Sequence, residues 1–437
     1  MYKSFLLLTV ILSITLLSAC ASLPTPPGKD DLKILDNQIY RSDKAFTVQA
    51  VHVPGLLEKG AGLEFMVPAM AHIAEVGGNA ICLDLTGFSP EGKSLDPKSV
   101  ETVGVYAERA KDQRMVLVVR VVSDAGDAAF RQNAVATAAR ALGEQRLAFY
   151  WIDGPDAPAL AAQFKKLAPN LLLAATENGD IRVTTDPAEA GDNGLMLLVG
   201  ALPQDPWGKT NYVMPGADDS YAKMEEAYTN PVEREPWTPD NSLLSEEERN
   251  EGFVSLFNGK DLNNWWRFYH GKESFRVSPE GFIENYQAGA GGLVTRDRYT
   301  DFILRLEYKL NAPDTNSGIH LWVPRAARQS KIGFEFQIMG DSALKEPHAT
   351  STGAIYDVLP AQATATRPEG EWNELEIMLQ GSHLKATLNG IVVQDVNMDE
   401  IEELRYRLRR GFIDLQDHDD YAAFRNVRIK VLEPTHE

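Results

Sequence analysis

The sequence predicts a multidomain chain, with an N-terminal α/β domain on a parallel sheet followed by an all-β sandwich. Between residues 46 and 215, apolar strand-like runs alternate with stretches whose apolar residues recur at helical spacing, which is the order of βα units. After residue 250 this spacing gives way to short strand-like runs separated by turn residues. A chain of 437 residues is long enough for two domains, or three.

The chain begins with a segment that is typical of export. The apolar run Phe5 to Leu17 is short for a membrane span, which needs about 20 residues. It ends in Leu17-Ser18-Ala19-Cys20, which resembles the lipobox of bacterial lipoproteins, where the chain is cut before a cysteine whose thiol is acylated. We therefore expect residues 1–19 to be a signal peptide, Cys20 to be lipidated, and the exported protein to be lipid-anchored, with Ala21 favouring the outer membrane. An ordinary secretory signal and a weak anchor helix are the alternatives.

Two segments are expected to lack a regular fold. Residues 20–45 include a proline-rich run and predict a tether, and residues 216–250 include three prolines and predict a linker. Ser245, followed by three glutamates, predicts the start of a short helix within that linker. These boundaries leave residues 46–215 for the α/β domain and residues 251–433 for the sandwich.

The elements of the N-terminal domain follow from hydrophobic spacing and from helix caps. Strands are expected at 46–53, 80–85, 115–122, 147–153, 171–176 and 195–202, and helices at 65–76, 97–111, 128–142 and 157–167. An open parallel sheet and a partial barrel both fit this order. Asp84, Arg120, Asp153 and Glu177 fall near the carboxyl ends of strands, where such folds bind ligands, although structural capping is the favoured interpretation. Cys82 is expected to be a buried core residue.

The charge of the chain excludes some classes of partner. The sequence has 62 acidic and 43 basic side chains, a net charge of −19. Phosphate backbones and anionic lipid head groups would repel such a body. No glycine-rich phosphate loop follows a predicted strand. We therefore expect no nucleic acid partner, membrane contact through the lipid anchor only, and a neutral ligand such as a carbohydrate.

The C-terminal half carries a series of motifs that together resemble one known family. In order they are Leu244-Ser-Glu-Glu-Glu-Arg to Trp265, Asn316-Ser-Gly-Ile-His320, Gly333-Phe-Glu-Phe-Gln-Ile338, Thr352-Gly-Ala-Ile-Tyr356, Gly370-Glu-Trp-Asn373, Asn389-Gly390, and Leu415-Gln-Asp-His418 before Phe424-Arg-Asn426. They resemble the 3-keto-disaccharide hydrolase domain, which implies a concanavalin-like jelly roll. The chain departs from the family pattern at Asp414 and Asp419, which puts the local loop shape in doubt. The resemblance does not reach the N-terminal domain.

Strand parity points to a ligand-binding face without help from the resemblance. Side chains two residues apart in a strand share a face. One face is expected to carry Asn316, His320 and Trp322 on one strand, Glu335 and Gln337 on a second, and Gln416 and His418 on a third. The opposite faces are apolar and predict the core. Amide, carboxylate, imidazole and indole groups suit a sugar, because they bind hydroxyls and stack on C–H faces.

The resemblance implies cleavage of 3-keto-glycosides or 3-keto-disaccharides. A ketone at C3 acidifies the proton on C2, so a base can remove it and the enolate can expel the group at C1. Water then adds to the enone. Such a site needs a base, a stabiliser for the enolate oxygen and an acid for the leaving oxygen.

Roles for the candidate residues follow from this chemistry. Glu335 or His320 is the candidate base, His348 or His418 the candidate acid, and Asn316 and Gln337 the orienting groups. The substrate-binding candidates are Asn316, Trp322, Gln337, Asp341, Tyr356 and Gln416. A divalent metal is a candidate cofactor with His320, Glu335 and His348 as candidate ligands, although no ligand spacing requires one.

Two other functions remain open at this point. The sandwich alone could hold sugars without catalysis, as a carbohydrate-binding surface lipoprotein. Alternatively, the N-terminal domain could be the enzyme, with Asp84 and Asp153 as its paired carboxylates and the sandwich as a binding module.

Overall fold

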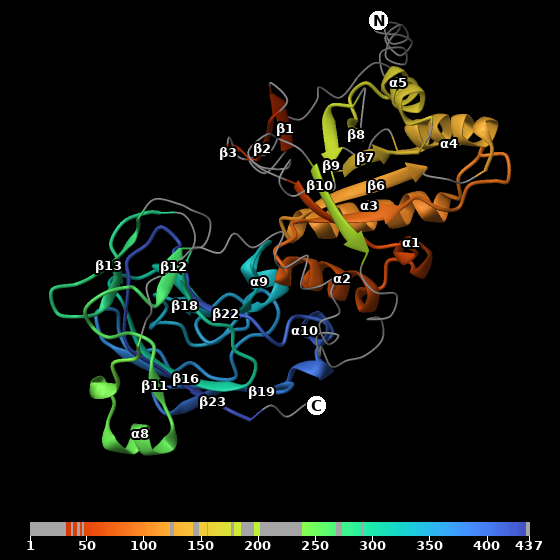
Figure 1. The fold of residues 1–437 in the computed structure, drawn as a ribbon. Helices are drawn as coiled ribbons and strands as arrows, with labels where there is room; N and C mark the ends of the chain where they lie inside the picture. The colour runs from red at the N-terminus through yellow and green to blue at the C-terminus, as the bar shows by residue number, and fades with distance from the viewer. Residues whose placement is uncertain are drawn as a thin grey trace, which may run out of the picture.

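The computed structural model describes residues 32–35, 38–41, 44–45, 48–122, 126–142, 148–154, 156–175, 179–184, 196–201, 238–267, 273–289 and 292–433. They form a parallel barrel with outer helices and an antiparallel sandwich (Figure 1). Arg298 and Arg328 of the sandwich pair with Glu75 and Asp112 of the barrel's helices. None of the described helices has the length and apolar character needed to cross a membrane. Cys20 and the predicted signal peptide lie outside the described residues.

The strands of the N-terminal domain close into a barrel. They are β4 (Val48–His52), β5 (Ala80–Asp84), β6 (Val116–Val122), β7 (Ala148–Ile152), β8 (Leu172–Ala175), β9 (Ile181–Thr184) and β10 (Met196–Ala201). All neighbours are parallel, and β10 closes the ring by pairing with both β9 and β4. The predicted parallel α/β class is confirmed, and of its two forms the structure shows a barrel.

Helices cover the outside of this barrel (Figure 1). They are α1 (Leu56–Lys59), α2 (Leu63–Glu75), α3 (Pro97–Asp112), α4 (Ala128–Ala141) and α5 (Ala157–Leu167). The side chain of Asp96 caps α3 and that of Asp127 caps α4, each by accepting from a backbone N–H of the first turn. All predicted helices of this domain are therefore present.

Small and branched side chains fill the inside of the barrel. Val48, Ala50, Ala80, Cys82, Val118 and Phe149 are fully buried and pack together. The barrel is therefore a packed core rather than a pore. Cys82 is a buried free thiol, as expected, and burial raises its pKa.

The tether predicted for residues 20–45 is not without regular structure at its C-terminal end. Residues 32–45 contain three short antiparallel strands, β1 (Leu32–Leu35), β2 (Gln38–Arg41) and β3 (Lys44–Ala45). Ile39 on β2 is fully buried and belongs to the cluster that fills the barrel. The prolines lie earlier in the chain, so they do not prevent strand pairing here.

The C-terminal domain is a two-sheet sandwich, as predicted. The larger sheet has the order β13 (Phe275–Val277), β14 (Ile283–Asn285), β23 (Ala422–Val431), β16 (Phe302–Leu310), β19 (Asn373–Gln380), β20 (His383–Leu388) and β21 (Ile391–Asn397), with β11 (Val254–Ser255) beside β23. The smaller sheet has the order β12 (Trp265–Arg267), β15 (Leu293–Thr295), β22 (Phe412–Leu415), β17 (Asn316–Val323) and β18 (Phe334–Met339). Burial alternates along β16, because its odd and even residues face opposite sides.

Short helices connect the strands of the sandwich. They are η1 (Asn241–Leu243), α8 (Glu246–Glu251), α9 (Gln329–Ile332), η3 (Met398–Glu400) and α10 (Glu402–Arg405). The motif Asn389-Gly390 forms the turn of a hairpin between β20 and β21, with φ of 49° and 80° at the two positions. Residues 353–358, which include most of the Thr352-Gly-Ala-Ile-Tyr356 motif, do not form a strand. Gly353 and Asp357 both have positive φ, so this segment turns and makes only isolated bridges.

The predicted cap at Ser245 is a full capping box. Its hydroxyl accepts from the backbone of Glu248, whose carboxylate accepts from the backbone of Ser245. We expect Ser245→Ala to lower the free energy of unfolding of the sandwich by about 1 kcal/mol, because one backbone donor loses its partner. Ser245→Asp, which keeps a cap acceptor, should match the wild type in the same denaturant titration. Equal stability of the Ala and Asp variants would contradict this role.

Candidate functional site

One line of residues across the smaller sheet forms the candidate site. His320 on β17 lies opposite Glu335 on β18 and opposite Asp414 on β22. Directly paired residues of neighbouring strands point to the same face, so the three side chains meet. All three are buried. We call them the Glu–His–Asp triad.

The triad holds a cation between two carboxylates. Nδ1 of His320 lies 2.6 Å from Oδ2 of Asp414, and Nε2 lies 3.4 Å from Oε2 of Glu335. Burial disfavours the charged imidazole, but Glu335 and Asp414 outweigh it and raise the pKa of His320 to about 10. Both ring nitrogens then carry protons and donate. His320 is therefore not the base, which corrects one of its two predicted roles.

Two glycines make room for the carboxylates of the triad. A Cβ on Gly318 would lie 2.6 Å from Oε1 of Glu335, and a Cβ on Gly292 would lie 1.6 Å from Oδ1 of Asp414. Neither position has a positive φ, so glycine is required here by space rather than by backbone conformation. The glycine in the Asn-Ser-Gly-Ile-His motif therefore has a direct structural reason.

Amide side chains extend the polar face on both sides of Gly318. Gln416 donates from Nε2 to Oε1 of Glu335 at 2.9 Å, and Gln337 donates to Oδ1 of Asn316 at 2.8 Å. Three buried oxygens of this face, on Asp414, Gln337 and Gln416, have no hydrogen-bond partner within the described chain. Buried acceptors are rarely left unpaired, so the face is suited to a ligand that donates from hydroxyls.

Trp322 does not belong to this face, which corrects its predicted role in substrate binding. The pairing of β17 with β22 shifts register between His320 and Val323, and Trp322 has a φ of 52°. The strand therefore reverses its parity just before Trp322. Its ring is fully buried in the core, and its indole N–H donates to the carbonyl of Thr300 at 2.9 Å.

The remaining predicted residues are not gathered around the triad. His348 and His418 are exposed, and neither makes a hydrogen bond or an ion pair with the triad. The Asp341 carboxylate accepts from the backbone of Thr352 at 2.7 Å and so fixes a loop. Tyr356 lies beside β18, where its backbone N–H donates to the carbonyl of Glu335.

Asp414 was not among the predicted site residues, and in the sequence it appears only as a departure from the family pattern. Strand parity nevertheless applies to it. Asp414 is two residues before Gln416, so the two side chains share a face. A buried acid on the polar face of a sheet requires a cationic partner, and His320 supplies it.

The candidate metal ligands do not assemble into one site. Within the described ranges, no group of three or more His, Cys, Asp or Glu side chains is arranged to hold a metal ion. His320 directs both ring nitrogens at carboxylates and has no lone pair left for a cation. The predicted set of His320, Glu335 and His348 therefore does not fit a metal.

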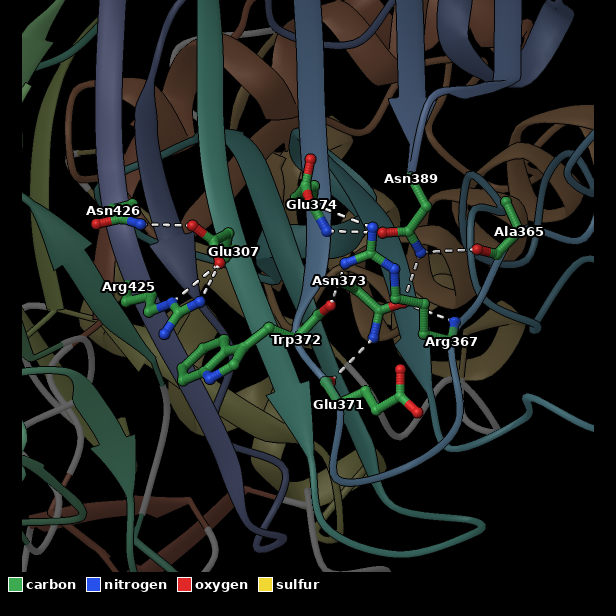
Figure 2. A network of polar contacts seen from close by, with 10 residues as sticks. All are labelled: Glu307, Ala365, Arg367, Glu371, Trp372, Asn373, Glu374, Asn389, Arg425 and Asn426. Carbon is green, nitrogen blue, oxygen red and sulfur yellow. Dashed lines mark hydrogen bonds and ion pairs between the residues drawn. The ribbon is translucent and has the colours of Figure 1, made fainter. Parts of the chain in front are cut away.

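Three of the family motifs have a structural role on the other sheet (Figure 2). Oδ1 of Asn373 accepts from the backbone of Arg367 and from Nδ2 of Asn389, both at 2.8 Å, which ties β19 to the turn after β20. The Arg425 guanidinium stacks over the Trp372 ring with its carbon 4.2 Å from the ring centroid and is ion-paired with Glu307. These motifs support the larger sheet and leave the polar face of the smaller sheet for chemistry.

Comparisons with known proteins concern the sandwich. A curated 3-keto-disaccharide hydrolase of Bacteroides thetaiotaomicron is 25% identical over 241 residues, covering 42% of this chain and 79% of that protein. A solved structure from Parabacteroides distasonis, provisionally assigned as a glycosyl hydrolase, is 26% identical, covers 44% of this chain and 99% of its own, and has a TM-score of 0.39. A second such structure from the same organism is 26% identical, covers 41% and 99%, and has a TM-score of 0.36.

A family model gives the same assignment with residue bounds. It matches residues 252–430, the whole of the sandwich from β11 almost to the end of β23. The C-terminal half of the chain therefore carries a 3-keto-alpha-glucoside-1,2-lyase-like domain.

Proposed function

We propose that the sandwich cleaves the glycosidic bond of 3-keto-glycosides or 3-keto-disaccharides. The domain family and the name of the Bacteroides relative support this class of substrate. The observation that carries the proposal is the triad, which places a buried carboxylate beside a fixed cation on a face rich in hydroxyl acceptors. A neutral oxidised sugar suits such a face, because it brings donors and no charge.

The proposed reaction begins at the C2 proton of the substrate. Glu335 accepts this proton, which the C3 ketone has made acidic, and the electrons form the C1–C2 double bond as the C1–O bond breaks. The leaving oxygen takes up a proton. Water then adds at C1 and a proton returns to C2, so the sum of the two steps is hydrolysis.

His320 acts in this scheme as a positioning residue. Its imidazole contacts one oxygen of the Glu335 carboxylate, and Gln416 fixes the other oxygen. Asp414 holds the imidazole ring from the far side. The proton for the leaving oxygen is assigned to His418, which follows Gln416 in the same loop, with His348 as the alternative.

One observation favours sugar binding without catalysis. Both oxygens of Glu335 already have partners, Gln416 on one and His320 on the other. A carboxylate held in this way can accept a sugar hydroxyl as well as remove a proton. Assays of binding and of turnover on the same protein separate the two functions.

We expect Glu335→Gln to reduce aglycone release from a 3-keto-glucoside by at least about 100-fold, the scale expected for loss of a positioned base. Release is followed for the keto sugar and for its unoxidised parent, which should not react. Glu371→Gln, an exposed acid on the other side of the sandwich, is the matched control and should behave as the wild type. Full activity in Glu335→Gln would rule out the proposed base, and binding without release by the wild type would establish the binding function instead.

We expect the assigned acid to depend on the leaving group. An alkoxide leaving oxygen needs a proton far more than a nitrophenolate does, because its conjugate acid is weaker. His418→Gln should therefore slow cleavage of a 3-keto-disaccharide by tenfold or more and leave a 4-nitrophenyl 3-keto-glucoside almost unaffected. His348→Gln is measured in parallel. An equal loss on both substrates would show that His418 serves another purpose.

We expect the charge on His320 to make stability depend on pH. Its pKa is raised from 6.5 to about 10 in the folded chain, so its stabilising contribution is complete below pH 6.5 and is lost as the pH rises through about 10. The free energy of unfolding should therefore fall between these pH values in the wild type. In His320→Gln this part of the pH dependence should disappear. Parallel denaturant titrations at several pH values test this, and an identical slope in both proteins would contradict it.

A further inference from the structure

The barrel presents a second polar cluster at its mouth. His52, Asp84, Arg120 and Trp151 lie at or near the carboxyl ends of β4, β5, β6 and β7, and Asp153 follows β7. Each of the first four is two residues beyond a side chain that fills the barrel. They therefore form the next inward-facing layer above the apolar core.

Ion pairs join this layer across four neighbouring strands, β4 to β7. The Arg120 guanidinium lies 2.9 Å from Asp153 and 3.3 Å from Asp84, and Nε2 of His52 lies 2.9 Å from the same oxygen of Asp84. These contacts link side chains to one another rather than to a helix end. Asp84 is bonded to the side chains of His52 and Arg120 and caps no helix among the described residues.

Solvent reaches this layer but not the one beneath it. The side chains of His52, Asp84, Arg120 and Asp153 are 17 to 28% exposed, whereas Ala50, Cys82 and Val118 below them are fully buried. The cluster is the floor of an accessible end of the barrel. Parallel barrels place their sites at this end, because the loops after the strands surround it.

Trp151 supplies an independent sign of a ligand. Its residue is only 9% exposed, and its indole N–H is buried without a hydrogen-bond partner in the described chain. The ring contacts both members of the cluster beside it, Arg120 over its face at 5.0 Å and His52 at its edge at 6.5 Å. An unpaired buried donor costs about 1–3 kcal/mol, which a hydroxyl acceptor on a ligand would offset.

We propose that the mouth of the barrel binds a neutral sugar unit, at a site separate from the triad of the sandwich. The two carboxylates accept hydroxyls, Arg120 and the Trp151 indole donate, and the aromatic ring offers an apolar surface. The cluster has two carboxylates and one guanidinium, and this excess of negative charge disfavours phosphates and other anions.

The same geometry argues for binding rather than hydrolysis at this site. Burial acts to raise the pKa of Asp84, but His52 and Arg120 outweigh it and hold that pKa below its usual range. Glycosidases need one carboxylic acid that keeps its proton. Asp84 is therefore held as a carboxylate, which suits it to accept hydroxyls rather than to donate a proton.

Calorimetry on the purified full chain tests this site with three probes: methyl α-glucoside, an unoxidised glucosyl-glucose disaccharide and glucose 6-phosphate. We expect a neutral probe to bind, and glucose 6-phosphate to bind at least tenfold more weakly. Asp153→Asn and Trp151→Phe should each weaken binding of the neutral probe by about tenfold. Trp151→Phe keeps an aromatic ring at this position and removes the indole N–H with the rest of the pyrrole ring, so it answers the question if Asp153→Asn does not fold.

Glu335→Gln locates the binding event, because this change lies in the sandwich. Binding that persists there and is lost in the barrel variants supports the proposal. Binding lost in Glu335→Gln and kept in Trp151→Phe and Asp153→Asn would overturn it, as would tighter binding of glucose 6-phosphate or no binding of either neutral probe. Aglycone release tests the function of the sandwich separately, so the two proposals can fail independently.

Discussion

The buried charge of His320 is the constraint on which the candidate site depends. An ion away from water is tolerated only when partners surround it, and His320 has an acid on each side. The strand order β22-β17-β18 meets this requirement, because it places Asp414, His320 and Glu335 next to one another. The same requirement explains Gly292 and Gly318, since any side chain there would displace a carboxylate.

The polar side chains of the two sheets of the sandwich have different roles. Polar side chains such as Glu307, Arg425 and Asn373 link the strands of the larger sheet to one another (Figure 2). Their hydrogen-bonding groups have partners on neighbouring strands or turns. The smaller sheet carries buried oxygens without partners, on Asp414, Gln337 and Gln416. These three acceptors lie on the face of the triad, where the hydroxyls of a ligand would supply the missing donors.

The spacing of apolar residues and the turn residues allowed most helices and strands to be predicted. Features that depend on which strands pair, and in which register, could not be predicted. Parity placed Asn316, His320, Glu335 and Gln337 on one face, as the structure shows. It failed at Trp322, because a shift of register between β17 and β22 depends on the partner strand and leaves no local signal. The sequence likewise left undecided whether the parallel sheet closes into a barrel, because closure depends on β9 and its pairing with β10. The charge of His320 could not be predicted, because Asp414 lies far away in sequence.

The same electrostatic arrangement, a cation between two carboxylates, occurs in both domains of the chain, although their folds differ. In the sandwich, His320 sits between Asp414 and Glu335 of the antiparallel neighbouring strands, and in the barrel, Arg120 sits between Asp84 and Asp153 at the ends of parallel ones. A central cation fixes two acids in position, while the excess of acid keeps anions away. Fixed carboxylates are acceptors already ordered for hydroxyls, so little entropy is lost when a sugar binds. The two proposed sites therefore share a chemistry that favours neutral polyols, on a chain with a net charge of −19.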